Sequence, residues 1–280
     1  MQADDYRGRV VYVVGGSMGI GLAVAREFAR RGADVMVFAR RPEPLERAVQ
    51  EIRECRCSEG QRVDSRTLDV CAPDAVSAVM DDAVSRFGAP GVLFNCAGGA
   101  RPNHFEAISH QQLSEMMQLN LNGSWHTVQA LLPHMKERGG TIVNTSSLAG
   151  IIGVFGYTDY CASKFAVIGF SEALRSELKR YGIRVFVLCP PDTETPGLEA
   201  ENKTKPAETR AVAANARLMT AEAVAAELLR GIERRRLLII PGFEGRASAL
   251  AKRLFPGLVE WVTDRAVAKA ARHTAGRPPS

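Results

Sequence analysis

The sequence predicts an α/β fold, in which one doubly wound domain contains a seven-stranded, mainly parallel sheet with helices on both faces. Short apolar runs alternate with amphipathic stretches along most of the chain, which is typical of βαβ units. The first run, residues 10–14, is apolar throughout, as expected of a strand covered on both faces. A length of 280 residues suits one such domain with a large core.

The predicted elements follow one another in a regular order. We expect strands at residues 10–14, 33–38, 63–68, 91–94, 140–145, 183–188 and 237–240, and helices at 20–31, 44–54, 73–87, 109–136, 157–181 and 221–234. Residues 1–242 are expected to form the catalytic domain. Within it, residues 190–218 are rich in Pro, Thr, Glu and Lys and are long for a connector, which indicates a lid or a substrate-binding loop. Residues 243–280 are expected to form a basic amphipathic tail.

Composition and charge exclude several classes of protein. Apolar residues make up 46% and charged residues 24%, and no segment approaches the roughly 18 unbroken apolar residues of a membrane-spanning helix. The start of the chain lacks the features of a secretory signal, so we expect a cytoplasmic protein with reduced cysteines. No Cys or His spacing indicates a metal site. The net charge of +5 comes mostly from the tail and accompanies no nucleic-acid recognition motif, so no nucleic-acid partner is expected.

A glycine-rich turn follows the first predicted strand. Gly15, Gly19 and Gly21 occur with the spacing Gly-x-x-x-Gly-x-Gly directly before a helical pattern. Glycines let a backbone approach a pyrophosphate closely, and the charge of the pyrophosphate then lies at the positive end of the following helix. The alternative interpretation is a tight strand-to-helix turn with no ligand. The position after the first strand favours a dinucleotide site that also includes Ser17, Met18 and Ile20.

The end of the second strand bears on the choice of cofactor. NAD-preferring dinucleotide folds usually have Asp or Glu there for the ribose hydroxyls, whereas an Arg accommodates the 2′-phosphate of NADP. Ala39 occupies the expected acidic position, and Arg40 and Arg41 follow it, which predicts NADPH. The alternative is that both arginines only begin a solvated helix. We expect further cofactor contacts after the third and fourth strands, from Asp69, Val70, Asn95, Ala97 and Gly98.

A candidate reaction centre follows the fifth strand. Tyr160 and Lys164 are separated by four residues in a predicted helix and therefore share one face, about 6 Å apart at the backbone. An adjacent ammonium would lower the pKa of the phenol toward the working range. Ser147, at the end of the strand, is placed to donate a hydrogen bond to a substrate carbonyl. Taken singly, each residue has an alternative interpretation as a packing tyrosine, a solvated lysine or a cap.

The glycine turn, the segment 95–98, Asn120, Ser147 and the pair Tyr160 and Lys164 together resemble the short-chain dehydrogenase/reductase family, from about residue 9 to residue 240. The resemblance implies a Rossmann-type domain in which Tyr160 protonates the nascent alkoxide and Ser147 polarises the ketone. It also implies that Lys164 binds the nicotinamide ribose and tunes Tyr160, and that Asn120 positions a water for proton relay. Val14 departs from the family pattern, which commonly has Thr at that position.

The segment after the sixth strand narrows this resemblance. Its Pro-Pro-Asp-Thr-Glu-Thr-Pro-Gly run and its Glu-Asn-Lys-Thr-Lys-Pro stretch are similar to those of 3-ketodihydrosphingosine reductases. Pro191 replaces the glycine of most relatives and stiffens the base of the loop. Pro190, Thr193 and Thr195 are then expected to contact the cofactor. The implied reaction is NADPH-dependent reduction of 3-ketodihydrosphingosine to dihydrosphingosine, in sphingolipid biosynthesis.

Two other functions stay open at this point. One is reduction of another ketone, such as a 3-oxoacyl thioester or a polyketide or steroid-like carbonyl, with the same residues. The other is a non-catalytic NADP(H)-binding regulatory protein, against which the joint presence of Ser147, Tyr160 and Lys164 argues. The resemblance further implies a homo-oligomer, either a dimer or a tetramer.

A long-chain substrate calls for an apolar channel and a route from a membrane. Candidate channel walls, which are equally plausible as ordinary core, are Ile151, Ile152, Val154 and Phe155. In the tail, Leu250, Leu254, Leu258 and Val262 recur every four residues among basic residues, and Pro256 is expected to divide the run into two short helices. Such a stretch predicts peripheral contact with the cytoplasmic membrane face, or alternatively packing on its own domain or a neighbouring subunit.

Overall fold

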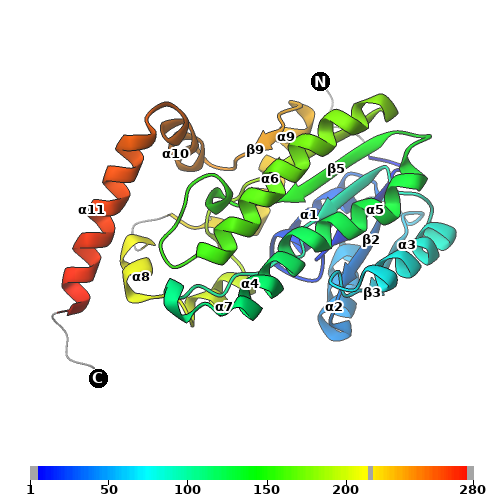
Figure 1. Ribbon diagram of the computed structural model, residues 1–280. Coiled ribbons are helices and arrows are strands. Elements are labelled where there is room, and N and C mark those ends of the chain that lie inside the picture. Colours follow the sequence, from blue (N-terminus) through cyan, green and yellow to red (C-terminus); the bar gives the residue numbers. More distant parts are fainter. Residues whose placement is uncertain (1–5, 214–216, 276–280) are drawn as a thin grey trace.

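The computed structural model describes residues 6–213 and 217–275 (Figure 1). Parts of the predicted domain (1–5), lid (214–216) and tail (276–280) lie outside the described residues. Within the described ranges, seven parallel strands form one sheet in the order β3-β2-β1-β4-β5-β6-β9. This order reverses between β1 and β4, which is where open α/β sheets bind ligands beyond the carboxyl ends of their strands. The predicted doubly wound fold is confirmed.

The strands of the main sheet and the helices are close to the predicted ranges. The strands are β1 (Val10–Val14), β2 (Asp34–Ala39), β3 (Val63–Thr67), β4 (Val92–Asn95), β5 (Gly140–Thr145), β6 (Ile183–Leu188) and β9 (Leu238–Ile239), and a separate pair joins β7 (Thr193–Glu194) to β8 (Met219–Thr220). The helices are α1 (Gly19–Arg30), α2 (Pro42–Glu54), α3 (Pro73–Phe87), α4 (His110–Met117), α5 (Gly123–Met135), α6 (Thr158–Leu178), α7 (Pro196–Asn202), α8 (Ala207–Ala213), α9 (Ala221–Glu233), α10 (Phe243–Leu254) and α11 (Pro256–Ala275).

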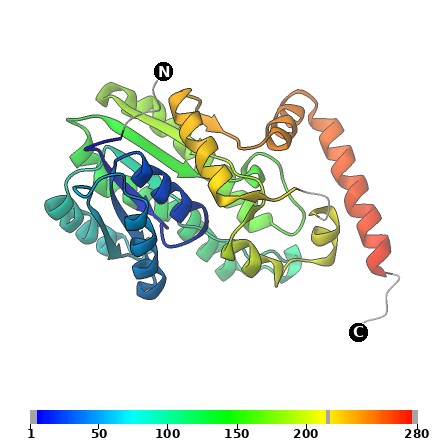
Figure 2. The same ribbon diagram turned by 180° about the vertical axis from the view of Figure 1, so that it is seen from behind.

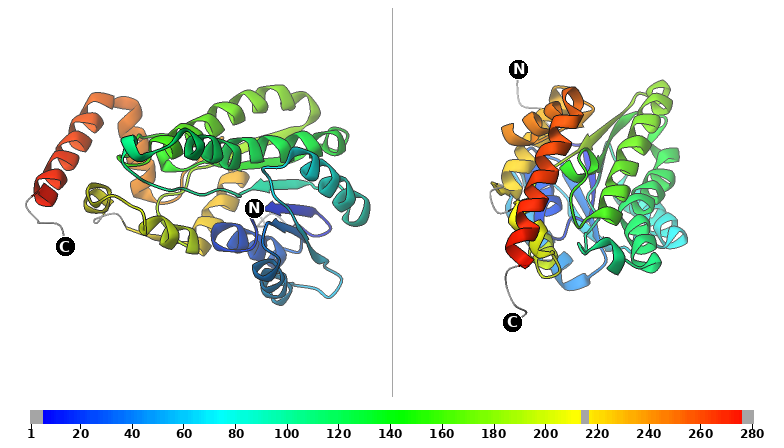
Figure 3. Two further views of the ribbon diagram at one scale, coloured as in Figure 1. Left: turned by 60° about the horizontal axis from the view of Figure 1, so that its bottom comes forward. Right: turned by 60° about the vertical axis from the view of Figure 1, so that its left-hand side comes forward.

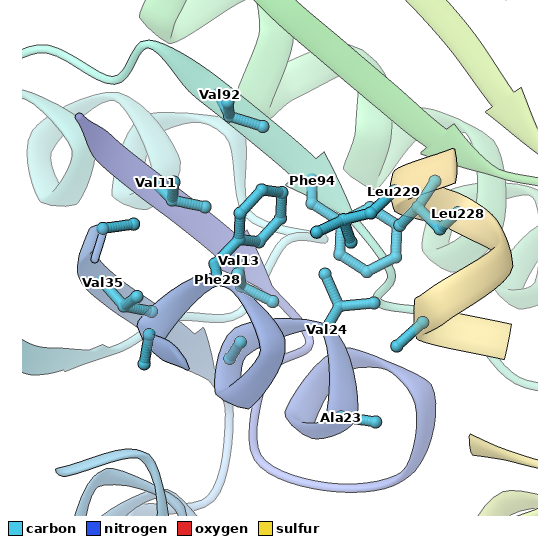
Figure 4. Close-up of a cluster of buried hydrophobic side chains, with 14 of the residues drawn as sticks. Val11, Val13, Ala23, Val24, Phe28, Val35, Val92, Phe94, Leu228 and Leu229 are labelled. Atoms are coloured by element: carbon cyan, nitrogen blue, oxygen red, sulfur yellow. The ribbon is translucent and has the colours of Figure 1, made fainter. Parts of the chain in front are cut away.

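Alternating side chains of the strands fill two cores, one on each face of the sheet. Val11 and Val13 of β1 pack with Phe28 of α1 and Leu228 of α9 on the face that Figure 2 brings forward, and Figure 4 shows this cluster from close by. Tyr12 points the other way and packs with residues of α3 and α5, which cover the near face in Figure 1. Burial on both faces explains why β1 has no polar alternation.

The predicted helix at residues 109–136 is wrong as one continuous element. The structure divides it into α4, a π-helical turn at Gln118–Asn122, and α5. The turn contains Asn120, whose buried amide is hydrogen-bonded to Gly99 and Ser163 across the helix layer. A π turn accommodates one extra residue per turn and is common at functional sites. These tertiary hydrogen bonds are not encoded in local periodicity.

The predicted lid contains regular structure. Thr195 caps α7 by accepting a hydrogen bond from the Leu198 N–H at 3.2 Å, and Pro196 occupies the first turn of this helix. Pro206 directly precedes α8 and accepts a backbone hydrogen bond from Arg210 at 3.0 Å. Prolines and threonines that indicate a loop by composition therefore start two short helices, because proline is tolerated before and in a first helical turn.

The tail consists of two helices separated at Pro256, as predicted, but the second is longer than expected. The helix α10 has 12 residues and α11 has 20. Figure 3 shows α11 extending beyond the end of the sheet, and α11 packs against α8 and α10. No helix among the described residues is long and apolar enough to cross a bilayer.

Candidate active site

A cavity of about 760 Å³ opens at the carboxyl ends of β1, β4 and β5. This volume is within the range of small-molecule and cofactor sites. One end is formed by the glycine turn and the start of α1. The rest of the wall is formed by residues that follow β2 to β5, by residues of the segment from Pro190 to Thr209, and by Glu244, Gly245 and Ser248 of α10. The tail therefore contributes to the wall of the cavity.

The glycine turn has the close backbone approach that a dinucleotide requires. Gly15 has φ +82°, and a Cβ built on it would lie 2.5 Å from the backbone nitrogen of Ala97. A Cβ on Gly21 would overlap the carbonyl oxygen of Gly15. Since no larger residue fits these positions, the turn brings the amino end of α1 to the cavity, where its N–H groups and dipole favour a pyrophosphate. The residues present fit the predicted cofactor.

Almost all predicted cofactor-binding residues lie on the cavity wall. They are Gly15, Ser17, Met18, Gly19, Ile20, Gly21, Arg40, Arg41, Asp69, Val70, Ala97, Gly98, Tyr160, Lys164, Pro190, Thr193 and Thr195. Asn95 is not among the lining residues. Its side chain is buried, donates to Asn144 at 3.0 Å and accepts from Thr127 at 2.8 Å. Asn95 thus links β4 to β5 and α5 behind the cofactor end.

The three predicted reaction-centre residues meet at the cavity. Tyr160 and Lys164 lie one turn apart on α6, with the Lys164 Nζ 5.6 Å from the centre of the Tyr160 ring. Lys164 is buried and its Nζ donates to the Thr145 carbonyl at 3.0 Å. Ser147 follows β5 and accepts a hydrogen bond from the Ala149 N–H at 3.1 Å. All three side chains face one space, as a cooperating acid and hydrogen-bond donor require.

The predicted lowering of the Tyr160 pKa by Lys164 is wrong for this structure. Burial raises the pKa of Tyr160 well above its ordinary value, the nearby Glu201 carboxylate raises it further, and a hydrogen bond with Ser147 acts in the opposite direction. Burial also lowers the pKa of Lys164 to about 8. The ammonium hydrogen-bonds to Thr145 and lies over the ring of Tyr160, and burial of the phenol is the largest cause of its pKa shift.

Asn120 lies behind this site, outside the cavity lining. Its Oδ1 accepts from the Gly99 N–H at 3.0 Å, and its Nδ2 donates to the Gly99 carbonyl at 3.0 Å and to the Ser163 Oγ at 2.9 Å. A Cβ on Gly98 would come within 2.8 Å of Asn120 and 3.3 Å of Lys164. Asn120 therefore fixes the turn after β4 next to Lys164. Its role in a water relay stays a prediction.

Comparison with known proteins identifies the family. The short chain dehydrogenase family matches residues 9–206. The chain belongs to this family. Among its relatives is the 3-ketodihydrosphingosine reductase of Mus musculus, 39% identical over 80% of this chain and 68% of the relative. The 3-dehydrosphinganine reductase of Danio rerio is 40% identical over 78% of this chain and 66% of the relative. The chain spans about two thirds of the length of both.

Two solved structures have the same fold. Levodione reductase superimposes with a TM-score of 0.78 at 26% identity, covering 86% of this chain and 99% of its own. An archaeal alcohol dehydrogenase from Thermococcus sibiricus, complexed with 5-hydroxy-NADP, has a TM-score of 0.69 at 25% identity over 80% of this chain and 90% of its own. The family and these neighbours support a nicotinamide cofactor in the crevice.

The cavity of this short chain dehydrogenase is also lined by residues that were not among the predicted site residues, and four of them interact with one another. They are Tyr157, Asp192, Glu201 and Lys205. Lys205 is only 5% exposed, and its Nζ lies 4.0 Å from the Asp192 Oδ2. Burial raises the pKa of Glu201 to about 7, and the neighbouring Tyr157 side chain acts in the opposite direction. Asp192, Glu201 and Lys205 lie in the two sequence runs that resemble 3-ketodihydrosphingosine reductases. This resemblance was the signal that could have identified them as site residues.

Two of the four predicted channel walls, Ile152 and Val154, line the cavity, whereas Ile151 and Phe155 do not. The ring of Phe155 instead packs edge-on against His104, with their centres 5.8 Å apart. No group of three or more His, Cys, Asp or Glu side chains in the described part of the chain is arranged to hold a metal ion.

The raised pKa of Glu201 predicts a pH-dependent stability. In the unfolded chain this carboxyl ionises near its ordinary pKa of 4.5, whereas in the folded protein it ionises near 7, beside Lys205, Asp192, Tyr157 and Lys164. The folded state therefore binds the extra proton between these values, and its stability falls as the pH rises through them. We expect Glu201→Gln to have a higher melting temperature relative to wild type at about pH 8 than at about pH 5. An equal difference at both pH values would contradict the raised pKa.

Proposed function

We propose that this protein reduces the 3-keto group of 3-ketodihydrosphingosine to dihydrosphingosine with NADPH, in sphingolipid biosynthesis. The observation that carries the proposal is one cavity whose wall combines the cofactor turn, the Ser147, Tyr160 and Lys164 site, and the 190–205 segment. That segment resembles sphingoid-base reductases in sequence. The names of relatives at 39 and 40% identity, from Mus musculus and Danio rerio, support the same substrate.

Ser147, Tyr160 and Lys164 each have a separate role in the reduction. A reduced nicotinamide bound in the crevice would supply a hydride to the carbonyl carbon, which would leave the negative charge of an alkoxide on the carbonyl oxygen. Ser147 donates a hydrogen bond to the carbonyl oxygen, where negative charge develops. Tyr160 then transfers its hydroxyl proton to that oxygen, so that one hydride and one proton complete the alcohol. Lys164, with its pKa lowered to about 8, lies beside the resulting phenolate and can return a proton to it.

The raised pKa of Tyr160 suits the direction of reduction. Burial and the Glu201 carboxylate both disfavour the phenolate, so the hydroxyl stays protonated until an alkoxide of higher basicity forms beside it. Asn120 holds the backbone at Gly99 next to Lys164, and we propose that it orients a water of the proton relay, as the family resemblance implies.

We propose NADPH as the cofactor because of the charge at the end of β2. Arg40 and Arg41 are exposed and line the cavity beside Ala39, which carries no charge that would repel a 2′-phosphate. Arg41 reaches back to the glycine turn, with its Nη2 3.8 Å from the Met18 Sδ. Arg47 of α2 borders an adjoining hollow together with Arg41. Guanidinium groups bind phosphates through paired, charge-assisted hydrogen bonds.

We further propose that α10 and α11 contact an anionic membrane on the cytoplasmic side. Leu254 and Phe255, at the end of α10, and Leu258, Trp261 and Val262 of α11 are each more than half exposed. The exposed positions of α11 continue at intervals of three or four residues into the exposed cations Arg265, Lys269 and Arg272. One face thus carries apolar groups for insertion and cations for acidic headgroups.

We also propose that the protein is cytoplasmic and that it assembles into a dimer or a tetramer. The exposed rings of Trp125 on α5 and Phe165 on α6 support an association surface away from the tail. The alternative function, reduction of a 3-oxoacyl thioester or another ketone by the same residues, is distinguished by substrate assays.

We expect Tyr160→Phe to lower kcat with 3-ketodihydrosphingosine by at least about 100-fold, because it removes the proton donor. NADPH binding should change little, since the ring is retained. The measurement is NADPH oxidation in mixed micelles, with NADPH affinity determined by fluorescence. Tyr181→Phe, at the far end of α6 and outside the cavity, is the matched control. Turnover of the Tyr160 variant near the native rate would show that the proton comes from another group.

Replacing both Arg40 and Arg41 by Ala should lower kcat/KM for NADPH by about tenfold or more and leave kcat/KM for NADH nearly unchanged. Two charge-assisted contacts to the 2′-phosphate would be lost, and a loss of 1.4 kcal/mol corresponds to tenfold. The control is Arg138→Ala, an exposed arginine that does not line the cavity. Equal losses with both cofactors, or none, would argue against a phosphate-binding role.

We expect the protein to co-sediment with phosphatidylglycerol vesicles more than with phosphatidylcholine vesicles, and less at high salt. Leu258→Ser with Trp261→Ser should reduce the bound fraction several-fold, because the inserted apolar area is lost. Phe105→Ser, which changes an exposed ring elsewhere, is the control. Sedimentation that is absent or insensitive to the tail variant would refute membrane contact, and conversion of an oligomer to monomers would identify a subunit interface.

A further inference from the structure

Two carboxylates lie in the same cavity as the catalytic phenol. Glu201 lies on α7 and Asp192 just before β7, and both line the cavity with Tyr160. Of the charged groups that shift the pKa of Tyr160, Glu201 has the largest influence and Asp192 a smaller one, and both raise it. Glu201 is therefore the carboxylate that acts most strongly at the reacting hydroxyl.

One buried cation is shared between these carboxylates. The Nζ of Lys205 lies 4.0 Å from Asp192, and Lys205 also stabilises the charged form of Glu201. Lys164 has a weaker effect on Glu201 and donates its own hydrogen bond to Thr145. Arg217 and Glu244 also line the cavity and carry opposite charges. Lys205 is thus shared between Asp192 and Glu201, and its ammonium can pair closely with only one carboxylate at a time.

Glu201 interacts with a neighbouring phenol. The side chain of Tyr157, which is buried, lowers the pKa of Glu201 and so favours its charged form. Burial nevertheless makes the charged form unfavourable, since the pKa of Glu201 rises to about 7. Glu201 is thus desolvated and only partly neutralised. Such a carboxylate can bind a cation that enters the cavity.

We propose that Glu201 binds the ammonium group of a 2-amino ketone, so that the substrate class of this site is α-amino ketones. This inference rests on the proposed function and identifies how that substrate is recognised. In an α-amino ketone the nitrogen is attached to the carbon next to the carbonyl. When the carbonyl oxygen lies at Ser147 and Tyr160, the ammonium therefore lies close to the same hydroxyl that Glu201 influences.

Binding of the ammonium by Glu201 also discriminates against ketones that lack an amino group. A 3-oxoacyl thioester has no cation beside its carbonyl and would leave Glu201 facing an uncharged chain. A site built for a charged partner discriminates strongly against an analogue that lacks it, because the buried group is then unpaired. Glu201 is thus a specificity-determining residue, whereas Tyr160 and Ser147 act on any ketone that reaches them.

The test compares 3-ketodihydrosphingosine with the chain-matched 1-hydroxy-3-ketone that lacks the 2-amino group, both in the same mixed micelles with NADPH. Wild type should prefer the amino ketone. Glu201→Gln should lower kcat/KM for the amino ketone by about 10- to 100-fold, as expected for one charge-assisted contact, and change that for the other ketone by less than about threefold. Glu199→Gln, an exposed carboxylate on the same helix that does not line the cavity, should retain the wild-type preference.

The outcomes separate this inference from the proposed function. If wild type reduces neither ketone, or only the one without the amino group, the proposed function fails. If wild type reduces the amino ketone but Glu201→Gln lowers both activities equally, Glu201 has only a structural role and the inference is overturned. Should the variant not fold, the N-acetylated amino ketone provides a second measurement with wild type, and reduction of this uncharged analogue as fast as the free amine would also overturn it.

Discussion

The chemistry of this protein depends on desolvation of the cavity at the carboxyl end of the sheet. Burial is the largest cause of the pKa shifts of Tyr160, Lys164 and Glu201. It keeps the phenol protonated, lowers the pKa of the ammonium and leaves a carboxylate poorly solvated. The protonation state of each group therefore depends strongly on a charge that forms or binds beside it, because interactions between charges are strong where water is scarce.

Features determined by local spacing could be predicted from the sequence. Gly15 and Gly21 occupy positions where a side chain would collide with neighbouring backbone, and such requirements leave an unmistakable pattern. Tyr160 and Lys164 share a face because four residues make about one helical turn. The strands were recognisable because burial on both faces removes polar residues from runs such as β1.

Features determined by distant contacts could not be predicted in the same way. Asn120 interrupts a helix because its amide bonds to Gly99 and Ser163, which are remote in sequence. The direction of the Tyr160 pKa shift depends on how completely the fold removes water from the phenol, and the spacing to Lys164 contains no information about that. Glu201 and Lys205 were visible as part of a motif, but their position opposite the phenol follows from how α7 and the segment after it pack.

Two separate stretches of the chain form the wall of the cavity, and changes in them affect different parts of the site. The glycine turn and the residues that follow β2, β3 and β4 contribute the amino-terminal part of the wall, whereas the 190–209 segment and α10 contribute the carboxyl-terminal part. Because Glu244, Gly245 and Ser248 belong to α10, changes in the tail can reshape the substrate end without disturbing the nucleotide cradle. Preference for one ketone over another can therefore be altered through the carboxyl-terminal third of the chain, whereas Arg40 and Arg41, the residues proposed to select the coenzyme, lie in the amino-terminal half.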